Sequence, residues 1–300
     1  MKQSDNMKRI LVIVVTYNGM KWVDKCMQSV VGHLLPVDVM VVDNGSTDGT
    51  VEHIREYYPS VILHCTGENY GFGRANNIGF RHAMKNGYEY VYLLNQDAWV
   101  FPDTFGILVD AMEDDKSLGV LSPMQLTATE QNLDPRFEKW CPPAAWSDFR
   151  KKGSCSSKVY GVKFVMAAHW MISRDCLEDV GGFSPAFTHY GEDDNFLHRA
   201  RYKGYKIAVH SGAKAVHDRE MRPMSKKAKM RLKCVASVVK VSNPLEKLWF
   251  RLLFQPIELL AISIRYRSMY VFKNIFTLIR SYRKLISIRR DSLDDMAFLK

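Results

Sequence analysis

The chain has no long uncharged apolar segment, which limits the ways in which it can meet a membrane. None of its apolar runs approaches the roughly 18 residues that a membrane-spanning helix needs. The first eight residues are polar and lead straight into an apolar run, so we expect no secretory signal. With 300 residues and 47% hydrophobic content, the chain can bury one large core and carry an appendage.

Cysteine pairs are missing as well. The six cysteines form no Cys-x-x-Cys unit and show no spacing typical of metal ligands. Scattered thiols of this kind are typical of a reducing cytosol, where they act as small core residues. We therefore expect a cytoplasmic protein.

Acidic residues are scarce at the C-terminal end. Residues 222–300 contain 18 Lys or Arg and 5 Asp or Glu, whereas the first 221 residues contain 24 and 27. This asymmetry predicts that only the tail meets an anionic surface. Apolar residues recur there at helical spacing, which favours basic amphipathic helices lying on an anionic membrane leaflet. A helical cap on the rest of the chain is the alternative, and no recognisable motif supports nucleic acid as a partner.

Short apolar runs alternate with helical stripes over the first 124 residues. We expect strands at 10–15, 37–42, 61–65 and 90–94, with helices between them. Four such repeats predict an α/β fold with a mostly parallel sheet flanked by helices. Residues 125–160 break the rhythm with prolines and aromatic residues, so we expect an irregular binding loop, with a flexible excursion as the alternative. Strands at 164–173, 207–209 and 213–217 and helices at 176–180 and 194–202 are expected to follow.

Polar clusters follow three of the expected strands. They are Thr16-Tyr17-Asn18-Gly19, Asp43-Asn44-Gly45-Ser46 and Asn95-Gln96-Asp97. Because ligands bind at the carboxyl ends of strands in such sheets, these clusters predict one shared site. A charge at Asp97, between two apolar runs, is costly unless it is paired, and a divalent cation is a natural partner. An Asp at a turn or helix N-cap is the alternative.

These clusters and the segments Asn69–Asn77, Gly181–Phe183 and Tyr190–Asp193 resemble, in unbroken order, a family 2 glycosyltransferase of the GT-A fold. The resemblance covers about residues 8 to 217. The Asn95-Gln96-Asp97 form particularly resembles the rhamnosyltransferase-like branch. The resemblance implies a GT-A domain over residues 1–221, with a nucleotide-sugar-binding half at 1–124 and an acceptor-binding half at 125–221. Residues 222–300 would be a basic helical extension.

The resemblance implies a nucleotide-sugar site at the polar clusters. The turn at Thr16, Tyr17 and Asn18 can offer backbone donors and an aromatic face to a pyrimidine. Asp43 and Asn44 would read the base edge, although a plain Asx turn also explains them. Gly71 would admit the nucleotide and Arg74 could pair with phosphate or base; a tight strand-to-helix turn is the alternative for the glycine. The residues that complete the implied set are Asn76, Asn95, Gln96 and Asp97.

A divalent cation, Mg²⁺ or Mn²⁺, would be held by Asp97 against the donor diphosphate. Asn95 replaces a second carboxylate, so the metal affinity should be weak without nucleotide. By resemblance His217 is a further metal or phosphate ligand, with a structural histidine as the alternative.

Three successive acids, Glu192-Asp193-Asp194, open a later helix. By resemblance Asp193 is the general base that deprotonates an acceptor hydroxyl, and Glu192 orients the acceptor or the base. One base without a carboxylate nucleophile implies single displacement with inversion. An acidic first turn stabilised by the helix dipole is the alternative.

The sequence thus predicts a cytoplasmic glycosyltransferase, peripheral on the inner membrane face. It would add one sugar from dTDP-rhamnose or a UDP-hexose to a glycan or lipid-linked glycan. A nucleotidyltransferase, a processive polysaccharide synthase and a non-catalytic carbohydrate-binding protein are the alternatives. The first lacks its Gly-rich loop after the first strand, and the second lacks its Gln-x-x-Arg-Trp segment and membrane spans.

Overall fold

The computed structural model describes residues 9–150, 158–220 and 223–300. Four parallel strands form the first half of one sheet, in the order β3-β2-β1-β4. Their bounds are β1 Ile10–Thr16, β2 Asp38–Asp43, β3 Ile62–Cys65 and β4 Tyr90–Asn95. The continuous apolar runs of the sequence form these strands because both faces of the sheet are covered.

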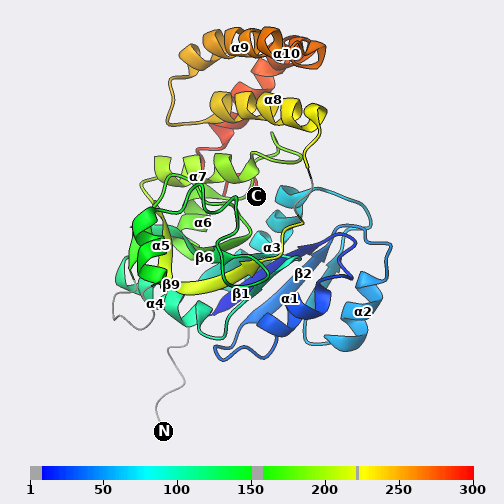
Figure 1. Ribbon diagram of the computed structural model, residues 1–300, viewed down its shortest axis with the longest axis vertical. Coiled ribbons are helices and arrows are strands. Elements are labelled where there is room, and N and C mark those ends of the chain that lie inside the picture. Colours follow the sequence, from blue (N-terminus) through cyan, green and yellow to red (C-terminus); the bar gives the residue numbers. More distant parts are fainter. Residues whose placement is uncertain (1–8, 151–157, 221–222) are drawn as a thin grey trace.

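Helices cover the two faces of the sheet (Figure 1). On one face α1 (Val23–Val30), α2 (Thr50–Tyr57) and α4 (Thr104–Asp114) share a core with Ile10, Val12 and Val14. On the other face α3 (Phe72–Asn86), α6 (Arg174–Val180) and α7 (Glu192–Tyr202) pack with Leu11 and Ile13. Successive side chains of β1 point to opposite faces of the sheet, so this strand contributes residues to both cores.

The second half of the sheet mixes strand directions. Strand β8 (His169–Ser173) runs antiparallel between β4 and β6 (Leu118–Leu126), and β9 (Lys206–His217) runs parallel to β6. The short strands β5 (Ala98–Val100) and β7 (Val159–Gly161) pair antiparallel with β9. The α/β fold is confirmed, and its parallel part is the first half. The two expected closing strands are one strand, whose pairing with β6 shifts register between Pro123 and Met124.

The expectation of an entirely irregular insert at 125–160 is wrong. Its two ends belong to β6 and β7, and a helix lies between them. Residues Pro143–Arg150 form α5, and Trp146 stacks on Phe149. A proline at the first position of a helix loses no hydrogen bond, because that N–H has no partner within the helix. Residues 151–157 of the insert lie outside the described part of the chain.

The three C-terminal helices stack on one end of the molecule (Figure 1). They are α8 (Lys226–Ser242), α9 (Leu248–Arg265) and α10 (Met269–Asp291), and they share a small core of their own. Helix α9 and the beginning of α10 form the outer layer, α8 lies toward the sheet, and α10 runs from the outer layer down along α8. Among the described residues, no helix combines the length and apolar character that crossing a bilayer requires.

The last residues return to the main core. The amide of Met296 donates to the carbonyl of Glu178, and the amide of Gly182 donates to the carbonyl of Ala297, both at 2.7 Å. Leu299 is buried among residues of the sheet core. The end of the segment 222–300 therefore packs on the main core, as the helical-cap alternative requires. The domain division between residues 221 and 222 remains a prediction.

Candidate functional site

Asp43 holds the loop after β2 in place. Its Oδ1 accepts from the amides of Gly45 and Ser46, at 3.0 and 2.9 Å. Its Oδ2 accepts from the hydroxyls of Thr16 and Ser46, at 2.9 and 2.5 Å. The side chain is buried and four donors already meet its two oxygens. The geometry is the Asx turn, and reading a base edge from Asp43 remains a prediction.

Asn44 ties the β2 loop to the start of α3. Its Oδ1 accepts from the amide of Tyr70 at 3.0 Å, and its Nδ2 donates to Asn69 at 3.3 Å. Gly71 has φ +79°, and a Cβ there would lie 2.5 Å from the carbonyl oxygen of Thr188. Gly71 thus lets the segment before α7 approach the α3 N-terminus, a packing reason that the sequence pattern did not indicate.

The loops after β1 and β4 are joined by Gln96. Its Oε1 accepts from the amide of Tyr17 at 2.8 Å, and its Nε2 donates to the carbonyl of Tyr17 at 3.3 Å. Asn18 has φ +51°, and its side-chain oxygen accepts from the amide of Thr47 at 2.8 Å. The three polar clusters of the sequence therefore meet at one edge of the sheet, as expected.

Two of the expected nucleotide residues lie apart from this network. Arg74 is exposed in the first turn of α3. Asn76 is buried and donates to the carbonyl of Phe72 in its own helix at 2.9 Å. Its neighbour Asn77, which the sequence did not single out, bonds both the amide and the carbonyl of Phe183, at 2.7 and 2.9 Å. Asn77 therefore joins α3 to the segment that follows α6.

Asp97 and His217 lie together, although 120 residues separate them. Oδ1 of Asp97 is 3.3 Å from Nε2 of His217, because β5 pairs Ala98 with His217. Arg219 Nη2 lies 3.0 Å from Nδ1 of His217, and Arg219 Nε donates to the buried Asp134 at 3.1 Å. A guanidinium can only donate, so these partners assign the proton of His217 to Nε2, facing Asp97.

The surroundings of Asp97 keep it ionised. Burial alone would raise the pKa of Asp97, but the hydrogen bond from His217, with a smaller part from the charge of Arg219, holds that pKa below its ordinary value. A carboxylate and an imidazole nitrogen at this separation fit a divalent cation, with water and diphosphate oxygens as the remaining ligands. Among the described residues, no group of three or more His, Cys, Asp or Glu side chains could hold a metal. Coordination through Nε2 would also require Arg219 to release Nδ1.

The three acids that begin α7 face a different environment. Helix α7 starts after Tyr190 and Gly191, both in left-handed conformations with φ +70° and +89°. The side chain of Glu192 is buried, and its Oε2 has no hydrogen-bond partner among the described residues. The amide of Asp194 donates to Oδ1 of Asp193 at 2.9 Å. Glycine adopts a left-handed conformation freely, whereas for Tyr190 it is strained, and strained residues cluster at functional sites.

All three carboxyl groups hold protons more strongly than usual. Burial, together with the neighbouring charge of Asp193, raises the pKa of Glu192 to about 7. Burial and the charges of Asp193 and Glu192 raise the pKa of Asp194 to about 7. Burial also raises the pKa of Asp193, while the amide of Asp194 and the charge of Arg219 oppose that rise. A raised pKa suits a carboxylate that must accept a proton near neutral pH.

One cavity of about 570 Å³ brings these groups together. Asn95, Glu192, Asp193, His217 and Arg219 all line it. Asp97 meets it through His217, and the charge of Arg219 acts on both Asp97 and Asp193. His217, one of the two expected metal ligands, and the expected base Asp193 therefore line one cleft, and Asp97 lies next to His217. The sequence missed Arg219, although its position two residues after His217 was a signal.

Two segments far from the strand ends complete this cavity. Arg136 and Trp140 come from the 125–160 insert, and Trp140 packs on Phe164 with ring centroids 5.0 Å apart. Val235 and Val239 come from α8. A Cβ at Gly191 would lie 2.8 Å from Val239, so α8 is packed directly on the segment that precedes α7.

Arg199 supports α7. Its guanidinium is buried and donates to the carbonyls of Val180 and Gly182, at 2.6 and 2.5 Å, and to Asn195 at 3.0 Å. It thereby fixes α7 against the end of α6.

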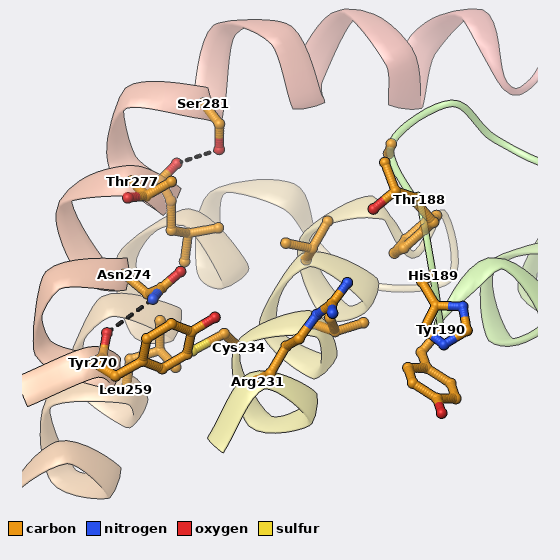
Figure 2. A pocket seen from close by; sticks show the side chains of 15 residues that line it. Thr188, His189, Tyr190, Arg231, Cys234, Leu259, Tyr270, Asn274, Thr277 and Ser281 are labelled. Atoms are coloured by element: carbon orange, nitrogen blue, oxygen red, sulfur yellow. Dashed lines mark hydrogen bonds between the residues drawn. The ribbon is translucent and has the colours of Figure 1, made fainter. Parts of the chain in front are cut away.

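A second cavity, of about 200 Å³, adjoins the first (Figure 2). Figure 2 shows the segment Thr188–Tyr190 on one side and α10 on the other, with Arg231 of α8 between them. Burial and then the charge of Arg231 lower the pKa of His189. Both cavities share His189, Tyr190 and Val235 as lining residues. The catalytic cleft therefore borders a partly apolar space among the C-terminal helices.

The chain is similar to known proteins in sequence and in fold. A family model described as Glycosyl transferase family 2 matches residues 11–181. The N-acetylglucosaminyl-diphospho-decaprenol L-rhamnosyltransferase of Mycobacterium tuberculosis is 23% identical over 230 residues, which cover 69% of this chain and 75% of the relative.

Two solved structures show the same fold. The crystal structure of S. aureus TarS 1–349 in complex with UDP is similar with a TM-score of 0.56 and 16% identity, over 95% of this chain and 90% of that one. The mannosyltransferase PcManGT from Pyrobaculum calidifontis, in complex with GDP-Man and Mn²⁺, gives a TM-score of 0.55 and 20% identity, over 96% and 88%. These likenesses confirm the expected GT-A fold.

Proposed function

The chain belongs to glycosyl transferase family 2 and is a glycosyltransferase, and we propose that it moves one sugar from a nucleoside-diphosphate donor to an acceptor hydroxyl by single displacement with inversion. The observation that carries this proposal is the cleft shared by Asp193, His217 and Arg219. A hydroxyl bound there can be deprotonated on the side away from the leaving diphosphate.

In this proposal Asp193 accepts the proton of the acceptor hydroxyl as its oxygen attacks the anomeric carbon. Glu192 is well placed to orient the acceptor, because its buried Oε2 lacks a partner among the described residues. Its pKa of about 7 lets it donate or accept a hydrogen bond near neutral pH. The charge of Arg219 lowers the pKa values of both Asp97 and Asp193, and so favours their ionised forms.

Asp97 and His217 would hold the Mg²⁺ or Mn²⁺ ion, with Asn95 beside them. When bound, the ion would neutralise the charge that develops on the leaving diphosphate. The neighbour with GDP-Man and Mn²⁺ supports a divalent cation. Arg219, once released from His217, can pair with a diphosphate oxygen.

The donor proposed is dTDP-rhamnose or a UDP-hexose. The turn at Thr16, Tyr17 and Asn18 lies at the carboxyl edge of the sheet, with Tyr17 47% exposed and free to stack on a base. The rhamnosyl donor is favoured by the Asn95-Gln96-Asp97 sequence and by the activity named for the mycobacterial relative.

The acceptor proposed is a glycan or a lipid-linked glycan at the cytoplasmic face of a membrane. The reactive sugar would lie at Asp193, and the remainder would extend past Tyr190 into the cavity of Figure 2. Arg231 could pair there with a phosphate, and Leu259 and Leu278 offer apolar contacts. The relative's acceptor, a diphospho-decaprenol carrying N-acetylglucosamine, has this combination of groups.

The test uses the purified full-length chain with Mn²⁺, a panel of dTDP- and UDP-sugars, and lipid-linked and free N-acetylglucosamine acceptors. We expect nucleoside diphosphate release that depends on one donor and on an acceptor, with a product one sugar longer and of inverted anomeric configuration. Products several sugars longer would indicate a processive synthase. No release with any pair would contradict the proposal.

A further inference from the structure

Helix α9 exposes an entirely apolar face. Between Lys247 and Arg265, every residue of α9 that is exposed is apolar. The large ones are Trp249, Phe250, Leu253, Phe254, Ile257, Leu260 and Ile264, and Trp249 and Ile264 are 64% and 69% exposed. Most of them recur every three or four residues, which places them along one stripe of the helix. The helix buries its other side, including Leu259, against α8 and α10.

Helix α10 adds a second stripe beside the first. Met269, Phe272, Phe276 and Ile279 are all exposed and recur at the same helical spacing. Helices α9 and α10 contact each other, and α9 with the beginning of α10 forms the layer farthest from the sheet (Figure 1). Large exposed apolar side chains gathered on two contacting helices are unusual on soluble monomers and mark a binding surface. We call these exposed side chains of α9 and α10 the outer face.

Basic residues border the outer face. Residues 245–291 contain ten Lys or Arg and three Asp or Glu. Eight of the basic side chains are exposed, including Lys273, Arg280 and Arg283 on α10. Two of the acids, Glu246 and Glu258, already pair with Arg251 and Lys240, at 2.7 and 2.5 Å. A positive rim around large apolar side chains complements an anionic lipid headgroup layer above acyl chains.

We propose that the outer face docks on an anionic phospholipid leaflet, with α9 and α10 lying in the interface. A second copy of the chain is a poorer partner, because two copies would bring their positive rims together. Helix α8 then lies between the lipid surface and the catalytic cleft, and a lipid-linked acceptor could reach Asp193 along it. The path of the lipid-linked acceptor rests on the proposed function. Docking itself does not, because it requires no sugar transfer.

The direct test is flotation of the full-length chain with vesicles. We expect binding to phosphatidylcholine vesicles that contain phosphatidylglycerol, much weaker binding to pure phosphatidylcholine, and weakening at high salt. The triple variant Trp249→Glu/Leu253→Glu/Ile257→Glu should lose at least tenfold in vesicle affinity. The variant Lys273→Glu/Arg280→Glu/Arg283→Glu should lose the preference for phosphatidylglycerol.

The matched control is Leu34→Glu, which changes a leucine that is 81% exposed far along the chain from the outer face; it should bind like the wild type. Circular dichroism and UDP binding with Mn²⁺ show whether each variant is folded. Equal vesicle binding by the apolar triple variant, or none by the wild type, would overturn the proposal. If the wild type is a dimer that does not bind vesicles, and the apolar triple variant is a monomer, the outer face is an interface between copies of the chain. Sugar transfer that persists without vesicle binding would overturn docking and leave the proposed function intact.

Discussion

The carboxylate of Asp97 lies 3.3 Å from the imidazole Nε2 of His217. Asp97 lies in the turn between β4 and β5, and His217 is the last residue of β9. The pairing of β5 with β9 creates this contact. On the opposite side of the imidazole, Arg219 occupies Nδ1. These three side chains connect the proposed metal position to the cleft that contains Asp193.

Loss of either proposed metal ligand should weaken metal-dependent nucleotide binding. We expect Asp97→Asn and His217→Gln each to reduce the affinity for UDP or dTDP with Mn²⁺ by roughly 10- to 100-fold. Binding without Mn²⁺ should change little, and isothermal titration calorimetry measures both. Asp103→Asn, an exposed acid nearby in the chain, is the control. Unchanged Mn²⁺-dependent affinity in both variants would remove these residues from the metal site.

Glu192 should make the folded protein less stable as the pH rises. Its pKa is raised from 4.5 to about 7, so the folded state binds its proton more tightly than the unfolded state does. Stability from this proton is present below about pH 4.5 and is lost as the pH rises through 7. Glu192→Gln should therefore raise the Tm by roughly a few degrees at pH 8 relative to the wild type, and by much less at pH 5.

Thermal unfolding at the two pH values measures this difference. Glu56→Gln on the exposed side of α2 is the matched control and should behave like the wild type at both. A Glu192→Gln effect of the same size at pH 5 and pH 8 would contradict the raised pKa.

The final residues should contribute strongly to stability. Leu299 is buried in the sheet core, and Leu299→Ala should lower the free energy of unfolding by roughly 2–5 kcal/mol. The exposed Leu34→Ala should change it by less than about 0.5 kcal/mol. Urea denaturation followed by circular dichroism compares the two. A loss no larger than that of the control would show that the chain end is not part of the core.

Filling the cavity of Figure 2 should affect the acceptor and leave the donor unaffected. Val238 lines that cavity and is absent from the lining of the catalytic one. We expect Val238→Trp to lower kcat/KM for a lipid-linked acceptor at least tenfold, with unchanged UDP or dTDP affinity. Lys229→Trp, on the exposed side of α8, is the control. Unchanged acceptor kinetics in Val238→Trp would exclude this cavity from acceptor binding.

The sequence predicted the parallel half of the fold and the edge at which the polar clusters meet. Buried runs such as Ile10–Val15 predict strands by themselves, and parallel strands place their carboxyl ends together. The antiparallel position of β8 was not predictable, because an apolar run does not specify its neighbours. The helix at Pro143–Arg150 was not predictable from the prolines, because a proline can begin a helix as well as interrupt one.

Contacts between distant residues account for the other gaps in the site. Arg219 bonds Asp134 across 85 positions, and Leu299 packs in a core formed mainly by residues before 217. Composition predicted a basic tail but not that α8 lines the catalytic cleft. For Asp43, Gly71 and Asn76 the hydrogen bonds and close contacts now give structural reasons, and their roles toward a nucleotide remain predictions.

The central claim is that Asp193 removes the acceptor proton, and the most direct measurement is acceptor-dependent nucleoside diphosphate release by Asp193→Asn. The account predicts a loss of roughly 10²- to 10⁴-fold in kcat with unchanged nucleotide affinity. It also predicts wild-type turnover for Asp175→Asn, which removes an exposed acid from the first turn of α6. Turnover by Asp193→Asn at the wild-type rate would contradict the account.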